Sequence, residues 1–426
     1  MLSPDIPLTR VTGMSLAEFG QTVNRKRKSI VSFLQEFSIP LIIGVLAALL
    51  FANVNWESYE HLIHLEPVAG LTIFGHSVTL HFIINDIFMV FFFGIAAKEI
   101  TESCLPGGSL NPFKKAINPL LATLGGVFGP VAAFFLGLHF MIGGDLFAGH
   151  EIGALQKGWG IPTATDIALA WLVARTVFGT GHPAINFLLL LAVADDAIGL
   201  GIIAIFYGDP VHPAEPIYLL LVLFAMGVAW FMRKSKVNNW APYIFVAGPI
   251  AWSGLMLARL HPALALVFIV PFLPGPKRDL GMFTEDERRP DHSPLNQFEH
   301  SIKLYVDLGL FAFAFANAGV PLSDIGPMTW LILGSLVVGK TVGITFFGWL
   351  ATKLGFPLPE RMGMLELMMA GFVAALGLTV ALFVAGAAFT DPVLLGQAKM
   401  GALFSGFVGC AAIGIGKLLR MSTRGK

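Results

Sequence analysis

Residues 184–207 read AINFLLLLAVADDAIGLGIIAIFY, an apolar run of membrane length with Asp195 and Asp196 at its centre. A helix needs roughly 20 apolar residues to cross the hydrocarbon core of a bilayer, and this run has that length. An alternative interpretation divides it into two half-spans joined at Asp195, but the apolar residues on both sides are unbroken. Because a charge inside the hydrocarbon is energetically costly, both carboxylates are candidate functional groups.

The composition of the whole chain is that of a membrane protein. Of its 426 residues, 55% are apolar and only 13% are charged, whereas about 25% are charged in a typical soluble domain. The 27 basic and 27 acidic side chains cancel, so the net charge gives no reason to expect nucleic acid as a partner. The two cysteines are too few for a disulfide framework.

Further apolar runs lie on both sides of this segment, separated by charged residues, glycine and proline. The fold class predicted from them is all-α, a polytopic membrane protein with about twelve transmembrane helices. Two of the runs are interrupted and predict broken helices, near residues 162–178 and 364–388. The other runs lie near residues 35–53, 81–103, 116–140, 184–207, 216–232, 240–258, 261–274, 302–320, 328–351 and 399–419.

The basic residues predict the orientation, because cytoplasmic loops of helical membrane proteins carry the excess of Lys and Arg. With both termini inside, all but four of the 27 basic residues lie on the cytoplasmic side. The four exceptions are Lys157, Arg259 and Lys399 outside, and Lys340 within a span. The predicted organisation is a cytoplasmic segment 1–34, a single transmembrane domain 35–420 and a cytoplasmic tail 421–426.

Two segments outside the spans have their own patterns. Leu71 to Leu80 alternates apolar and polar residues around Gly75-His76, which predicts a small β-hairpin on the outer surface. Residues 271–300 are charged and contain proline, so we expect a solvated inner connector.

The charged side chains at the inner end of the second span are also expected to be solvated: Lys98, Glu99 and Glu102.

Lys340 lies in the middle of the apolar run 328–351. A buried ammonium needs a counter-ion, and the span with two aspartates can supply one. Adjacent helix positions point about 100° apart, so Asp195 and Asp196 are expected to face different partners. A purely structural ion pair between Lys340 and one of these aspartates is the alternative to a role in function.

Thr165 and Asp166 follow the stretch Gly158-Trp-Gly-Ile-Pro-Thr-Ala164. Ordinary helix capping explains such a pair well, and Pro162 is compatible with a first helical turn. The apolar stretch that follows is short for an unbroken span, which instead indicates an unwound segment at membrane depth. Such a segment is tolerated only where it is buried in protein or lines a cavity.

Other ionisable residues lie nearer the ends of the spans. Asp86 and Asp307 are each a few residues inside a span, so an ion path and an ordinary interfacial position both remain open. No two histidines have the helical spacing of a metal site.

A buried carboxylate pair with a lysine suits a secondary transporter, in which one site binds a cation or protons and faces each side in turn. The two interrupted runs occupy the middle position of two groups, near 116–207 and 328–419, a pattern typical of inverted-repeat transporters. Intramembrane aspartyl proteolysis is less favoured, because Asp195 and Asp196 are neighbours on one helix and cannot face each other across a water. A conducting cation channel fits poorly with a buried lysine at the site.

At these residues the sequence resembles the NhaA-type sodium/proton antiporters, as a divergent member. The resemblance extends from about residue 35 to 419 and rests on four stretches: Gly158–Ala170, Leu191–Ile198, Phe313–Gly319 and Gly339–Ile344. Asn85-Asp86 followed by Phe91-Phe92 is similar to the family's second helix, and Arg259 to Leu264 to its eighth.

The resemblance implies exchange of cytoplasmic Na+ or Li+ for external H+, electrogenically, in pH and sodium homeostasis. It implies that Asp196 is the main carboxylate for Na+ and H+, and that Asp195 pairs with Lys340 and is a second Na+ ligand. It also implies that Thr165 and Asp166 belong to the same ion- and proton-binding site, where the broken helices cross. It further implies a homodimer joined through the outer hairpin, in the inner membrane of a bacterium. No organic cofactor is implied. Another cation- or proton-coupled carrier of the same fold is the alternative.

The sequence departs from the family pattern on its inner face. Gly94-Ile-Ala-Ala-Lys-Glu-Ile100 replaces the family's Gly-Leu-Glu-Val-Lys run, and Lys303-Leu-Tyr-Val306 replaces His-Pro-Trp-Val. These positions serve pH regulation in the family, so its activation pH is not transferred to this chain. Asp195, Asp196 and Lys340 are all retained.

Overall fold

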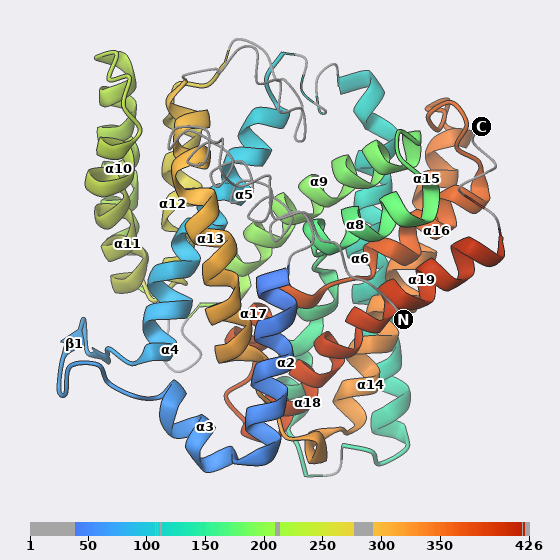
Figure 1. Ribbon diagram of the computed structural model, residues 1–426, viewed down its shortest axis with the longest axis horizontal. Helices are drawn as coiled ribbons and strands as arrows, with labels where there is room; N and C mark the ends of the chain where they lie inside the picture. Colours follow the sequence, from blue (N-terminus) through green and yellow to red (C-terminus); the bar gives the residue numbers. More distant parts are fainter. Residues whose placement is uncertain are drawn as a thin grey trace, which may run out of the picture.

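The computed structural model describes residues 39–106, 108, 110, 113–147, 149–208, 214–276, 293–419 and 421. The predicted segment 1–34, the tail beyond Met421 and residues 277–292 of the predicted connector lie outside this part of the chain. The described part is mostly helical (Figure 1).

The N-terminal elements end with the second long helix. They are α2 (Ile39–Val54), α3 (Trp56–Ile63), β1 (Thr72–Ile73), β2 (His76–Ser77), α4 (Leu80–Phe82), the π-helix η2 (Ile83–Phe88) and α5 (Met89–Ser103). The next group carries the aspartate pair on its last helix. It comprises α6 (Phe113–Gly143), α7 (Ile152–Gln156), the 3-10 helix η3 (Lys157–Thr163), α8 (Ile167–Phe178) and α9 (Pro183–Phe206).

A set of shorter helices follows. These are η4 (Pro216–Tyr218), α10 (Leu219–Lys234), η5 (Tyr243–Ala247), α11 (Gly248–Leu257), η6 (Pro262–Leu264), α12 (Ala265–Ile269) and η7 (Val270–Phe272). The C-terminal part contains α13 (Pro294–Ala318), η8 (Leu322–Asp324), α14 (Pro327–Gly334), the π-helix η9 (Ser335–Gly339), α15 (Lys340–Lys353), α16 (Met364–Ala374), α17 (Leu378–Ala388), α18 (Pro392–Phe404) and α19 (Gly406–Leu418).

Many of these helices are long enough to cross a bilayer. Among the described residues, seven continuous helices have the required length and apolar character, and counting each bent helix pair as one span gives up to nine. The bent pairs are Ile152–Thr163 with Ile167–Phe178, at 49°, and Met364–Ala374 with Leu378–Ala388, at 48°. Shorter apolar helices occupy the remaining predicted segments: Ile39–Val54, Tyr243–Leu257 and Pro262–Phe272. The fold is therefore that of a multi-pass helical membrane protein.

Three predicted starting points are wrong. The interrupted segment begins at Ile152 rather than near residue 162, and Pro162 lies inside the 3-10 helix η3 instead of opening an α-helix. Helix α13 begins at Pro294 rather than near residue 302, so residues 294–300 of the predicted solvated connector are helical, with Leu295 and Phe298 buried. The final segment begins at Pro392 rather than near residue 399. In each case the missed residues are a mixed polar and apolar stretch at the end of a span, where hydropathy gives little indication of helix.

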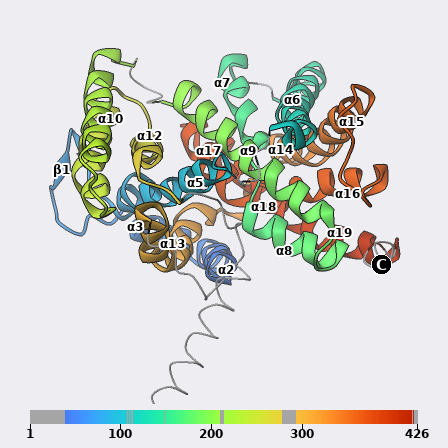
Figure 2. The same cartoon turned by 90° about the horizontal axis from the view of Figure 1, so that it is seen from above.

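The predicted hairpin is present as the antiparallel pair β1 and β2. Its two central residues, Phe74 and Gly75, have φ of 50° and 88°. Such positive φ values at both turn positions suit a tight two-residue hairpin, because the turn then matches the right-handed twist of the strands. In the views of Figures 1 and 2 the hairpin projects at the same end of the molecule as α10, away from α16 and α19.

Glycines allow the closest helix contact near the aspartate pair. A Cβ added to Gly343 of α15 would lie 2.0 Å from the carbonyl oxygen of Gly125 in α6. A Cβ added to Gly129 of α6 would lie 2.2 Å from the carbonyl oxygen of Gly339. Small residues let membrane helices approach through their backbones. Lys340 lies between Gly339 of η9 and Gly343 of α15, so this packing fixes the position of its backbone.

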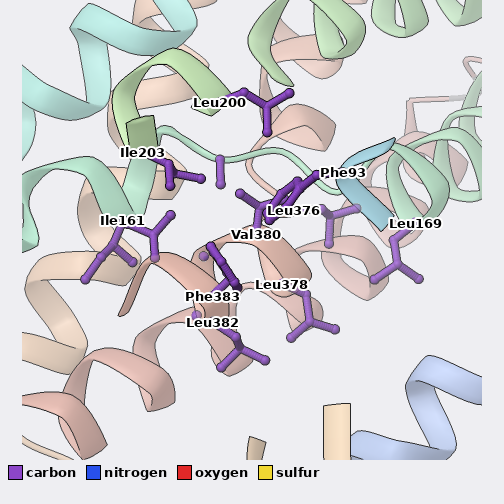
Figure 3. Close-up of a cluster of buried hydrophobic side chains, with 14 of the residues drawn as sticks. Phe93, Ile161, Leu169, Leu200, Ile203, Leu376, Leu378, Val380, Leu382 and Phe383 are labelled. Atoms are coloured by element: carbon purple, nitrogen blue, oxygen red, sulfur yellow. The ribbon is translucent and has the colours of Figure 1, made fainter. Parts of the chain in front are cut away.

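The apolar core surrounds the two broken helices. Figure 3 shows Phe93 of α5 beside Val380, Phe383 and Leu376, with Leu200 and Ile203 of α9 facing them. The rings of Phe93 and Phe383 meet edge to face, with centroids 5.0 Å apart. Side chains from three helices that are distant in the sequence therefore enclose the region where the helices break.

Candidate functional site

The unwound segments of the two broken helices cross and bond to each other. Residues 164–166 separate η3 from α8, and residues 375–377 separate α16 from α17. The amide of Asp166 donates to the carbonyl of Leu376 at 2.6 Å, and the hydroxyl of Thr165 lies 3.0 Å from the carbonyl oxygen of Ala374. Each unwound segment thus provides hydrogen-bond partners for backbone groups of the other segment that have no helical partner. Inside a membrane protein such groups must be satisfied internally.

Asp166 performs two tasks at this crossing. It is the N-cap of α8, and its Oδ1 accepts a hydrogen bond from the amide of Leu169 at 3.1 Å. Its Oδ2 accepts from the hydroxyl of Thr379 in α17 at 3.0 Å. The capping interpretation is therefore confirmed, and the same carboxylate also joins the two broken helices.

Lys340 and Asp195 form a fully buried ion pair. Lys340 Nζ lies 2.5 Å from Asp195 Oδ2, and neither side chain is exposed. The ammonium also donates to Thr165 Oγ1 at 2.5 Å, and that hydroxyl lies 2.6 Å from Asp195 Oδ2. A buried ion pair is tolerated when additional hydrogen bonds satisfy its remaining groups, and Thr165 supplies one such bond to each partner.

Asp196 has a different environment from its neighbour. Among the described residues no side chain makes a hydrogen bond or ion pair with its carboxylate, and the residue is only partly buried. It lines a cavity together with Asp195, whose Oδ1 is buried without a hydrogen-bond partner in the described part of the chain. The cavity walls come from α5, the first broken helix, α9 and α17: Phe92, Phe93, Ala96, Gly160, Thr163, Ala164, Gly199, Leu200, Ile202, Ile203, Val380 and Val384.

Asp86 and Asp307 lie away from this cavity. In η2, Asp86 Oδ1 is 3.9 Å from His261 Nδ1, and the backbone carbonyl of Asp86 accepts from the indole of Trp252 at 2.7 Å. Asp307 is half-buried in α13, one turn after Lys303. Neither carboxylate is among the groups that line the cavity with Asp196.

The prediction that Lys98, Glu99 and Glu102 are solvated is wrong. Lys98 is only 3% exposed and pairs with Glu102 Oε2 at 2.5 Å and with Glu99 Oε1 at 3.5 Å. It also pairs with Glu299 of α13. Sequence position suggested an interface, but α13 packs over this end of α5 and brings a carboxylate that compensates the buried ammonium.

Several residues that shape the site were not predicted to do so. Thr379 bonds Asp166, and Ser405 accepts a hydrogen bond from the amide of Gly377 at 3.2 Å through its Oγ. Tyr207 holds the backbone of η3 through its hydroxyl. Thr379 and Ser405 could have been found from the sequence, because each is a polar residue within an apolar run. Tyr207 gives no such signal, since aromatic residues are common at the ends of membrane spans.

Two broken helices that cross beside a buried ion pair and a cavity-facing carboxylate place this protein among the secondary transporters with discontinuous helices. The sequence model of the family described as Na+/H+ antiporter 1 matches residues 30–418. The chain belongs to this family, the NhaA sodium/proton antiporters, and is therefore a transporter rather than an enzyme.

Relatives named Na(+)/H(+) antiporter NhaA are similar to the chain over nearly its full length. The protein of Desulfitobacterium hafniense (strain DSM 10664 / DCB-2) is 58% identical, covering 92% of this chain and 97% of the relative. That of Geobacter metallireducens is 56% identical, covering 92% and 98%. That of Jannaschia sp. (strain CCS1) is 43% identical, again covering 92% and 98%.

Proposed function

We propose that this protein exchanges Na+ or Li+ from the cytoplasm for external H+, with Asp196 as the carboxylate that binds both. One observation carries the proposal: of two adjacent carboxylates, Asp195 is held by Lys340, whereas Asp196 lines the cavity without a described partner. An ionised carboxylate suits a hard cation, and a protonated one cannot hold it. Competition of Na+ and H+ for Asp196 would couple the two fluxes.

The neighbouring groups have supporting roles in this proposal. Asp195 would share the sodium ion with Asp196 through its Oδ1, which has no hydrogen-bond partner in the described part of the chain; both residues line the same cavity. Thr165 and Asp166 hold the unwound segments that form the rest of the site. Lys340 acts as counter-ion, and its release from Asp195 when a cation binds would link the ion to the conformational change.

The wider architecture follows the same proposal. We infer twelve spans with both termini cytoplasmic, in the bacterial inner membrane, with inverted repeats near residues 116–207 and 328–419. Each repeat has a broken helix between two longer ones, which supports this assignment. Exchange is electrogenic in this scheme, and the β1–β2 hairpin joins two copies into a homodimer. Asp86 and Asp307 are candidates for the ion path outside the cavity.

The test is sodium-driven proton movement. Everted vesicles or proteoliposomes containing the protein should change their internal pH when Na+ or Li+ is added, and should respond much less to K+. An equal response to K+ would favour another cation- or proton-coupled carrier of the same fold. If the correctly folded protein moves no protons in response to Na+ or Li+ at any pH tested, the proposal is wrong.

A further inference from the structure

Tyr207, at the end of α9, contacts the first broken helix through its hydroxyl group. The residue is 4% exposed and follows directly after the helix that carries Asp195 and Asp196. Its hydroxyl donates to the carbonyl of Lys157 at 2.7 Å and accepts from the amide of Gly160 at 2.8 Å. The two backbone groups are three residues apart, the spacing that a 3-10 turn pairs. One phenol therefore bonds both polar groups of a turn in η3.

The contact depends on glycine at position 160. A Cβ there would lie 2.5 Å from the Tyr207 hydroxyl oxygen and 2.7 Å from a ring carbon, closer than real side chains approach. Trp159 packs on the same side, with its ring 5.2 Å from Phe206 and 6.2 Å from Tyr207. The end of α9 and the middle of η3 are thus fitted closely to each other.

The same two elements are joined a second time at the site. Asp195 of α9 bonds Thr165, which immediately follows the last cavity-lining residue of the first broken helix. Gly160, at the first contact, and Thr163 and Ala164, between the two contacts, form one wall of the cavity that Asp196 lines. That wall is consequently held to α9 at both of its ends.

We propose that Tyr207 is a positioning residue for cation binding: its hydroxyl fixes the wall formed by η3 at a set distance from Asp196. Tyr207 does not line the cavity, so it acts on the ion only through this wall. The inference rests on the proposed function, because it assumes that the cation binds at Asp196.

The matched experiment compares Tyr207→Phe with Tyr243→Phe in proteoliposomes. Tyr243 is also fully buried, and its hydroxyl donates to the carbonyl of Val237 at 3.2 Å in another part of the fold. We expect Tyr207→Phe to raise the apparent KM for Na+ about tenfold, equivalent to about 1.4 kcal/mol, with a much smaller change in maximal rate. Tyr243→Phe should keep the wild-type KM.

A second variant disturbs the same contact from the other side. Gly160→Ala places its methyl group against the phenol and should raise the KM for Na+ in the same way. Gly201→Ala is the control and should keep the wild-type KM, because an added Cβ there meets nothing within 4 Å. Hydrogen exchange of residues 157–163 should be faster in Tyr207→Phe and unchanged in Tyr243→Phe. If Tyr207→Phe does not fold, Gly160→Ala carries the test.

A wild-type KM in either variant at the contact overturns the inference, and so does an equal KM change in Tyr243→Phe. The proposed function fails in a different way, namely through loss of sodium-driven proton movement in the wild-type protein itself. The two failures are therefore distinguishable.

Discussion

Lys340 Nζ lies 2.5 Å from Asp195 Oδ2, and both side chains are fully buried. Both Asp195 and Asp196, the next residue along α9, line the cavity, but Asp196 takes no part in the pair with Lys340. Successive helical positions point about 100° apart, so one helix can present Asp195 Oδ2 to the lysine while Asp196 has no described side-chain partner. This difference between neighbouring residues supports assigning the ion to Asp196, with Lys340 as the counter-ion of Asp195.

The two aspartates should respond differently to the loss of charge. Asp196→Asn should abolish sodium-driven proton movement, because an amide neither titrates nor offers an anionic ligand to a cation. Asp195→Asn should retain measurable but weaker exchange, since Asp196 is still present. Proton movement in proteoliposomes measures both. Exchange by folded Asp196→Asn at the wild-type rate would show that another group carries the ion.

Lys340 should matter for stability as well as for exchange. Lys340→Ala leaves Asp195 buried without its counter-ion, which should destabilise the fold by roughly 3–5 kcal/mol and lower its melting temperature. Lys340→Arg should be partly tolerated because it keeps the charge. If the pair is mainly structural, Lys340→Gln combined with Asp195→Asn should recover most of the lost stability and still transport. A double variant as unstable as Lys340→Ala would contradict the pairing.

The double variant also tests whether Lys340 carries a transported proton. In that case Lys340→Gln with Asp195→Asn should still exchange, but with fewer protons per cation and a weaker dependence on membrane voltage. Transport at defined membrane potentials measures this directly. An unchanged voltage dependence assigns Lys340 to the counter-ion role alone.

The buried charges at the end of α5 provide a second test of ion-pair burial. Lys98→Met would leave Glu99, Glu102 and Glu299 without the ammonium that holds them, at a cost of roughly 3–5 kcal/mol. Lys303→Met removes a cation whose side chain is 46% exposed, which should cost about 0–1 kcal/mol. Thermal unfolding in detergent compares the two variants. Equal shifts in melting temperature for Lys98→Met and Lys303→Met would mean that Lys98 is solvated.

The glycine contact between α6 and α15 should be intolerant of a single methyl group. In Gly343→Ala the new Cβ would meet the carbonyl of Gly125, so the helices must separate, at a cost of about 1–3 kcal/mol. Exchange should fall as well, because Lys340 moves with α15. Gly334→Ala, at a position with open space, is the control. Equal melting temperatures and rates for the two variants would contradict the predicted role of this packing.

Cysteine labelling should establish the topology. In a background with Cys104→Ser and Cys410→Ser, a cysteine near Lys234 or Arg288 should react only from the cytoplasmic side, and one near Asp209 or Asp324 only from outside. The expectation follows from the distribution of basic residues. Labelling near Lys234 and Asp209 from the same side would break the twelve-span arrangement.

The sequence alone determined the class of protein and indicated the residues proposed to form its site. Hydropathy and the positions of charges are local properties of the sequence, so apolar runs predict membrane helices. A charged residue in the middle of such a run is a functional candidate, because its burial in the bilayer is energetically costly. The short apolar stretch after Asp166 and the interrupted run near residues 364–388 likewise indicated the two broken helices, although the first helix began earlier than predicted.

The residue pattern by itself left open which carboxylate meets Lys340; the family resemblance implied Asp195, and only the tertiary structure shows the contact. The choice of Asp195 over Asp196 depends on the rotation of α9 relative to α15, which the backbone contacts of Gly125 and Gly343 help to fix. Likewise, the buried Lys98 pairs with Glu299 of α13, and the Tyr207 hydroxyl bonds the backbone of η3. These contacts join segments far apart in the chain, and a pattern along the sequence reports which residues are apolar or charged but not which distant group will lie opposite each one.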